Sequence, residues 1–133
     1  MATSKRPLSP FMIGPYYRPQ LTSVLSILHR ATGVFLVLGA VLLVAMLLAA
    51  AAGPEAFAIA TRCAYSLPGK ALALATVLAL AYHFFNGVRH LLWDIGWGYE
   101  LPRAYATGYL VVALTLFSTL AIALLALRAG GAA

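Results

Sequence analysis

Three long apolar stretches decide what this chain can fold into. They run from about residue 21 to 52, from 68 to 93 and from 105 to 127, and they contain few charged residues. A helix needs roughly 20 apolar residues to cross the hydrocarbon core of a membrane, and open sheet edges cannot face lipid. The pattern therefore predicts an all-α integral membrane protein whose membrane domain, residues 21–128, is an up-down bundle of three transmembrane helices.

The charge balance predicts how the bundle is oriented. The chain has nine lysines and arginines against three acidic residues, and in a membrane protein such an excess indicates topology rather than binding to nucleic acid. Six of the nine basic residues lie before, or early in, the first stretch or around the connector between the second and third: Lys5, Arg6, Arg18, Arg30, Arg89 and Arg103. This asymmetry predicts a cytoplasmic N-terminus and a periplasmic C-terminus.

The segments outside the three stretches are short. Residues 1–20 hold four prolines and are expected to form an extended cytoplasmic arm. This arm lacks the apolar core of a signal peptide, so we expect an unprocessed, multi-pass protein of the bacterial inner (cytoplasmic) membrane. Short connectors are expected around residues 53–70 and 95–104, and residues 129–133 form a short tail.

Polar residues gather at the end of the second stretch. His83, Gly87, His90 and Asp94 follow a spacing that places them on one helix face. Ionisable residues inside a membrane usually point into a bundle and mark a site. Gly87 leaves room for another helix or for a flat cofactor.

Two readings of His83 follow from this placement. It is either a buried neutral histidine bonded to a carbonyl, or an axial ligand of a haem iron. In the second reading the haem lies along Gly87 with its propionates toward the cytoplasmic side. His29, Arg30 and His90 would meet their charge there, Arg89 would also lie at this polar rim, and Asp94 would orient His90.

A second axial ligand is harder to find in the chain. His90 lies two turns along the same helix as His83 and cannot reach the opposite haem face. Helix-rise arithmetic separates the depth of His29 from that of His83 by more than about 10 Å. A haem with two histidine ligands is therefore expected to need a histidine from a second membrane subunit.

The start of the first stretch offers a different kind of site. Ser26, His29 and Arg30 cluster on one side of a helix. Arg30 at the membrane edge is either a topology anchor or, together with the Ser26 hydroxyl, a donor of hydrogen bonds to a quinone carbonyl.

The motifs S-x-x-H-R-x-x-G (residues 26–33) and H-x-x-x-G-x-R-H (residues 83–90), together with RPLSP at residues 6–10, resemble the cytochrome b membrane-anchor family of succinate dehydrogenase, respiratory complex II. The resemblance implies that His83 is an axial ligand of a haem b shared with a partner anchor subunit. It implies that Ser26 and Arg30 lie at the ubiquinone site and that His29, Arg30 and His90 lie near the haem propionates.

The resemblance also implies a flavoprotein and an iron–sulfur subunit as partners, which pass electrons from succinate to ubiquinone. FAD and iron–sulfur clusters would belong to those subunits alone, because this chain has one cysteine and no flavin-binding fingerprint. Alone, the chain is expected to be an anchor and electron-transfer subunit rather than a complete enzyme. Two alternatives stay open: an anchor of another quinone-linked dehydrogenase such as fumarate reductase, and a haem-free small transporter subunit.

Overall fold

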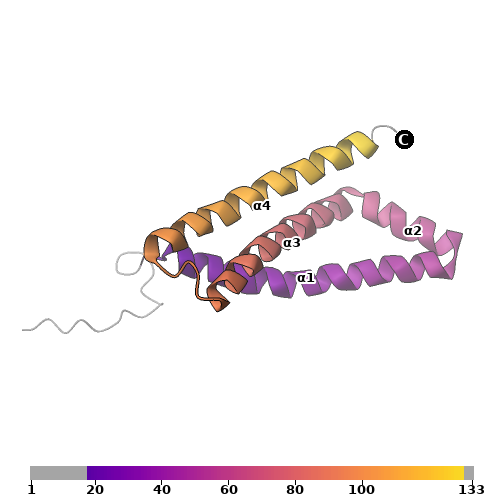
Figure 1. The fold of residues 1–133 in the computed structure, drawn as a ribbon. Coiled ribbons are helices and arrows are strands. Elements are labelled where there is room, and N and C mark those ends of the chain that lie inside the picture. The colour runs from indigo at the N-terminus through magenta and orange to yellow at the C-terminus, as the bar shows by residue number, and fades with distance from the viewer. Residues whose placement is uncertain (1–17, 131–133) are drawn as a thin grey trace, which may run out of the picture.

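The computed structural model describes residues 18–130, and this range contains four helices and no strand. The helices are α1 (Leu21–Ala52), α2 (Pro54–Tyr65), α3 (Leu67–Asp94) and α4 (Leu101–Gly130), as Figure 1 shows. Three of them, α1, α3 and α4, are long and apolar enough to cross a membrane. The predicted three-span α-helical bundle is thereby confirmed, while most of the expected N-terminal arm lies outside the described residues.

Helix α2 was not predicted, because only a connector was expected around residues 53–70. Pro54 lies in its first turn, where proline is tolerated, Glu55 follows in the same turn, and Arg62 lies in the last turn. These charges match the helix dipole. Gly53 has a φ of +119°, which lets the chain turn sharply out of α1. Helix α2 closes the end of the bundle opposite the start of α4 (Figure 1).

Helix α3 lies between α1 and α4, and all three meet at the end where α1 and α4 begin (Figure 1). The buried core at this end consists of Leu25, Tyr82 and Val111, one from each helix. The Tyr82 hydroxyl donates a 2.7 Å hydrogen bond to the Leu25 carbonyl. A Cβ atom at Gly108 would lie 2.9 Å from Cδ1 of Leu25, so this glycine lets α4 approach α1 closely.

The end of α3 is closed by a glycine turn that sends the chain back into α4. The Gly96 amide donates to the Trp93 carbonyl at 2.8 Å, and the Trp97 amide donates to the Leu92 carbonyl at 3.0 Å. This is the hydrogen-bond pattern of a Schellman cap, and its central residue, Gly96, has a φ of +82°. The tight turn keeps the last turns of α3 beside the first turns of α4.

Many large apolar side chains on the three long helices are exposed within the chain itself, among them Val34, Leu48, Phe84 and Phe117. In a bilayer such faces meet lipid tails or other transmembrane helices, so their exposure agrees with a membrane-embedded bundle.

Candidate functional site

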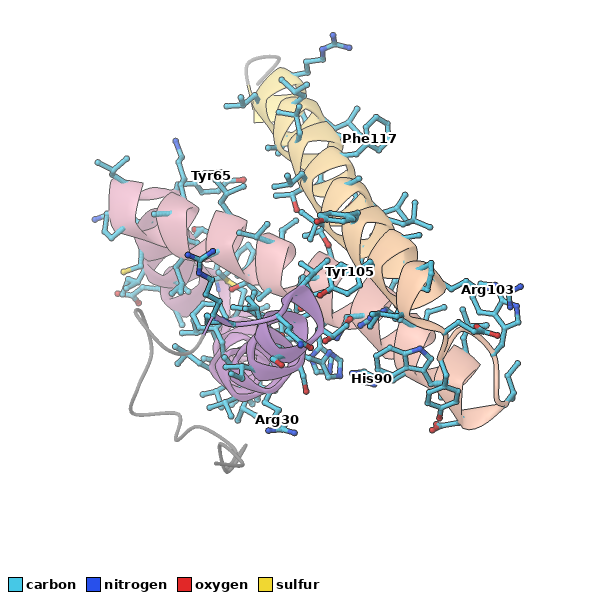
Figure 2. All side chains as sticks on the ribbon, turned by 90° about the vertical axis from the view of Figure 1, so that its left-hand side faces the viewer. Arg30, Tyr65, His90, Arg103, Tyr105 and Phe117 are labelled. Atoms are coloured by element: carbon cyan, nitrogen blue, oxygen red, sulfur yellow. The ribbon has the colours of Figure 1, made fainter. Side chains whose placement is uncertain are left out.

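The three histidines of the chain meet at one place between α1 and α3. The ring of His29 on α1 stacks on the ring of His83 on α3, with centroids 4.0 Å apart and planes inclined by 9°. The ring of His90, two turns further along the same face of α3, lies 5.0 Å from the His29 ring. Figure 2 labels His90, whose side chain lies near the start of α1. The histidines form a single cluster of titratable rings between α1 and α3.

The prediction that depth separates His29 from His83 was wrong. It placed His29 at the membrane edge because the purely apolar core of the first stretch begins later, at Gly33. The structure begins α1 at Leu21, so His29 lies eight residues into its helix, a rise of about 12 Å. His83 lies eleven residues before the end of α3, a rise of about 16 Å. Since these two helix ends lie at the same end of the bundle, the two histidines come level.

His83 is held in a slot made by α1. Its Nδ1 atom lies 3.1 Å from the His29 carbonyl oxygen and 3.4 Å from Oγ1 of Thr32. A Cβ atom at Gly33 would lie only 3.1 Å from Cε1 of His83, so a glycine here makes room for the ring. A carbonyl only accepts hydrogen bonds, so a bond to it places the proton of His83 on Nδ1 and leaves the lone pair on Nε2. A metal-ligating histidine has this arrangement, and so does a buried neutral histidine bonded to a carbonyl.

These residues fit a haem as one axial ligand, not as two. In the stacked pair, His29 presents its ring face to His83, so the two rings cannot ligate opposite sides of one iron. Nδ1 of His29 is buried and has no hydrogen-bond partner among the described residues. Buried polar atoms normally have partners, and an orphaned histidine nitrogen in this cluster suits a site that another group completes.

The sequence suggested that Asp94 orients His90. In the structure, the side chain that contacts the His90 ring nitrogen is Asn86. Nδ2 of Asn86 lies 3.4 Å from Nε2 of His90, and Asn86 is fully buried. The ring of His90 also makes an edge contact with Trp93, with centroids 5.1 Å apart. The importance of Asn86 was missed, although a lone amide between two histidines in an apolar stretch is a signal of a polar contact inside the bundle.

The Arg89 side chain packs against α4 and not against the histidine rings. Its side chain is 3% exposed and faces α4. It donates to the Ala104 carbonyl at 2.9 Å and to Oγ1 of Thr107 at 3.1 Å, and its guanidinium lies 4.1 Å from the centre of the Trp93 ring. Adjacent helix positions are about 100° apart, so Arg89 and His90 point toward different neighbours.

The space beside Gly87 is taken by α1 in the chain alone. A Cβ atom at Gly87 would lie 3.8 Å from Cε1 of His29, an ordinary contact distance.

Ser26 and Arg30 lie on α1 close to His29, as their spacing predicted. Ser26 is half-buried and Arg30 is exposed, and Figure 2 shows the labelled Arg30 side chain extending away from the bundle. Two apolar cavities lie between the helices: one of about 570 Å³ between α1, α2 and α3, and one of about 420 Å³ between α1, α3 and α4 that reaches Thr32 beside His83. Neither is lined by Ser26, Arg30 or a histidine.

Comparisons with known proteins identify the family of the chain. Residues 2–122 match the family described as "Succinate dehydrogenase/Fumarate reductase transmembrane subunit". The chain is 37% identical over 117 residues to the succinate dehydrogenase cytochrome b556 subunit of Rickettsia prowazekii, covering 88% of this chain and 90% of that protein. It is 39% identical over 108 residues to the protein of the same name from Paracoccus denitrificans, covering 81% and 82%.

A mitochondrial relative is similar over nearly the same range. The succinate dehydrogenase cytochrome b560 subunit of Homo sapiens is 34% identical over 122 residues, covering 90% of this chain and 71% of that protein. With the family match over most of its length and a three-span bundle, the chain belongs to the family of succinate dehydrogenase and fumarate reductase transmembrane subunits.

Proposed function

We propose that this chain is the cytochrome b membrane-anchor subunit of succinate dehydrogenase in a bacterial inner membrane. It would bind haem b together with a second anchor subunit and help to form the site where ubiquinone is reduced with electrons from succinate. The relatives compared above are all named succinate dehydrogenase cytochrome subunits, and this favours succinate dehydrogenase over fumarate reductase. A haem-free transporter subunit has no comparable support.

The single observation that carries the haem assignment is the environment of His83. Its Nδ1 atom faces the His29 carbonyl at 3.1 Å, which leaves Nε2 free to ligate iron. A bound haem would supply a centre that accepts and releases one electron at a time. The role of this chain is to hold the imidazole, keep its proton on Nδ1 and surround it with apolar helix faces.

His29, Arg30 and His90 are the proposed partners of the haem propionates, and Gly87 is the proposed packing position on the haem face of α3. The clustering of the three histidines supports this set. In the chain alone the His29 ring lies against Gly87, so a haem that packs on Gly87 requires this ring to turn aside.

A second membrane subunit is proposed because no other histidine of the chain is positioned to complete the iron coordination. His29 is excluded as the second ligand because its ring stacks on the ring of His83. The difference in depth expected from the sequence is not present. An iron–sulfur subunit and a flavoprotein are proposed to deliver the electrons, because a chain with a single cysteine, Cys63, cannot hold an iron–sulfur cluster by itself. They would approach from the cytoplasmic side, which is the side proposed for the N-terminus because most of the basic residues lie toward the histidine end of the bundle.

Ser26 and Arg30 are the proposed quinone ligands. They lie one turn apart on α1 at the same end of the bundle as the histidines, with Arg30 exposed toward a neighbouring subunit or headgroup region. A hydroxyl and a guanidinium would donate hydrogen bonds to the quinone carbonyl and stabilise the negative charge that develops on reduction.

The haem assignment is tested by His83→Leu and His90→Leu in the assembled complex. The leucine at residue 83 removes the axial ligand while the span stays apolar, so the low-spin haem spectrum should be lost or become high-spin. His90→Leu is the matched control on the same helix and should retain a low-spin haem. A reduced-minus-oxidised spectrum that is unchanged in His83→Leu would contradict the assignment.

The quinone site is tested by Ser26→Ala, with succinate oxidation by a soluble dye as the internal control. Losing one neutral hydrogen bond should weaken quinone binding by about 1 kcal/mol, and Arg30→Leu should weaken it by about 1.5–3 kcal/mol because its bond is charge-assisted. Dye reduction should persist, since succinate chemistry belongs to other subunits. Unchanged quinone reduction at low quinone concentration in both variants would leave Arg30 as a topology anchor only.

A further inference from the structure

A row of hydrogen-bonding side chains on α3 links the α4 interface to the histidine cluster. Arg89 lies against α4, Asn86 lies one turn before it, and His90 follows Asn86 by one turn. Nη1 of Arg89 lies 3.5 Å from Oδ1 of Asn86, and Nδ2 of Asn86 lies 3.4 Å from Nε2 of His90. Asn86 is 0% exposed, so water does not compete for its amide in the chain.

The polarity of this row is decided by chemistry. A guanidinium only donates hydrogen bonds, so Arg89 must face the oxygen of the Asn86 amide. The amide nitrogen, which also only donates, is then turned toward His90. Nε2 of His90 must accept this bond, and a neutral imidazole whose Nε2 accepts carries its proton on Nδ1.

Arg89 is itself held firmly enough to impose this direction. The Ala104 carbonyl accepts from Nη2 at 2.9 Å, and Oγ1 of Thr107 accepts from Nε at 3.1 Å. The hydroxyl of Thr107 donates to the Arg103 carbonyl at 2.9 Å, so its oxygen is available as an acceptor for Arg89. The face of Trp93 covers the guanidinium from another side.

We propose that Arg89 is a positioning residue which, by orienting the Asn86 amide, keeps the His90 ring in the tautomer that carries its proton on Nδ1. The effect reaches from the α3–α4 packing surface to the histidine cluster on α1 and α3. One consequence rests on the proposed function. There, His90 offers a haem propionate a hydrogen bond from a neutral ring and not a full positive charge.

The full chain suits a direct measurement because it has only three histidines. Uniformly ¹⁵N-histidine-labelled, haem-free chain in lipid bilayers gives nitrogen shifts by solid-state NMR, and these distinguish a proton on Nδ1 from one on Nε2. His90→Gln assigns the His90 signals by their disappearance. In the unaltered chain at alkaline pH, where the imidazoles are neutral, His90 should show the Nδ1–H tautomer. An Nε2–H tautomer there would overturn the proposal.

Two variants separate an orienting role from a packing role. In Asn86→Asp the carboxylate only accepts, so the His90 proton should move to Nε2. In Arg89→Gln the side chain can both donate and accept, so the Asn86 amide is no longer fixed and both His90 tautomers should appear. Arg103→Gln is the matched control: this arginine is exposed, pairs with Glu100 at 3.4 Å, and its loss should leave His90 unchanged.

The His83 signals report whether each variant folds, because the His29 carbonyl keeps the proton of His83 on Nδ1 independently of Asn86. A pure Nδ1–H tautomer of His90 in folded Arg89→Gln would overturn the role of Arg89. If Arg89→Gln does not fold, Asn86→Asp decides, and an unchanged His90 tautomer in that variant overturns the proposal. Because the chain is haem-free, these outcomes do not depend on whether the haem assignment holds.

Discussion

Replacing Gly33 by alanine tests whether α1 positions the His83 ring. The added Cβ atom would lie 3.1 Å from Cε1 of His83, closer than an ordinary van der Waals contact, so the ring must give by a few tenths of an ångström. The His29 carbonyl that accepts from Nδ1 belongs to the same helix as Gly33. A ring that moves away from α1 therefore stretches its 3.1 Å hydrogen bond toward the limit at which such bonds become weak.

The expected loss follows from the value of that bond. A typical hydrogen bond contributes about 0.5–1.5 kcal/mol net, and each 1.4 kcal/mol corresponds to a factor of ten in affinity. We expect Gly33→Ala to weaken haem binding by about 2- to 10-fold. Complete loss of the hydrogen-bond partner of a metal ligand typically lowers metal affinity by roughly 10- to 100-fold, and this substitution only stretches the bond.

Gly39→Ala is the matched control for this substitution. Its added Cβ atom would lie 2.9 Å from Cγ2 of Thr76, a clash at least as close in the same α1–α3 interface but away from the histidines. Both alanines also increase helix propensity by the same amount, about 1 kcal/mol. Any difference between the two variants therefore reports on His83 and not on helix packing in general.

The assay is haem content per assembled complex, followed across a range of haem supply, together with the low-spin optical signal. Gly33→Ala should need more haem to reach half saturation, and Gly39→Ala should match the unaltered complex. Equal haem retention in both variants would refute the reasoning, because it would mean that the contact with α1 does not influence how His83 binds.

Two further predictions concern the core where α1, α3 and α4 meet. Gly108→Ala would place a Cβ atom 2.9 Å from Cδ1 of Leu25 and should destabilise the bundle by about 1–3 kcal/mol through overpacking. Gly130→Ala is the control and should leave the stability unchanged, because the space around residue 130 is open. Both variants are measured by detergent-induced unfolding of the full complex. Tyr82→Phe removes the 2.7 Å hydrogen bond to the Leu25 carbonyl and should cost about 0.5–1.5 kcal/mol in the same assay. A Tyr82→Phe complex as stable as the unaltered one would mean that this bond adds nothing to the packing of α3 on α1.

The sequence by itself determined the class and most of the candidate site residues. Three apolar stretches of sufficient length admit only membrane-spanning helices, because backbone groups in lipid must be bonded internally. The spacing of His83, Gly87 and His90 places them on one face, because a helix has a fixed period of 3.6 residues. Both inferences use only local geometry, which every helix obeys whatever it packs against.

Helix α2 has local sequence signals at both of its ends. Pro54, Glu55 and Arg62 are typical of a helix start and end, yet the segment was expected to be only a connector. The helix has 12 residues and is too short for a span, so the apolar pattern that predicts the three spans does not predict it.

Only the tertiary structure decided what the polar residues touch. α1 starts and α3 ends at the same side of the bundle, and this brings His29 and His83, 54 residues apart in the chain, to one level. Counting depth from the edges of the apolar stretches did not predict this contact. Arg89 and His90 are neighbours in the chain, but one packs on α4 and the other faces His29. Which neighbour lies on each face of α3 depends on how three helices pack together, and helical periodicity alone carries no information about that choice.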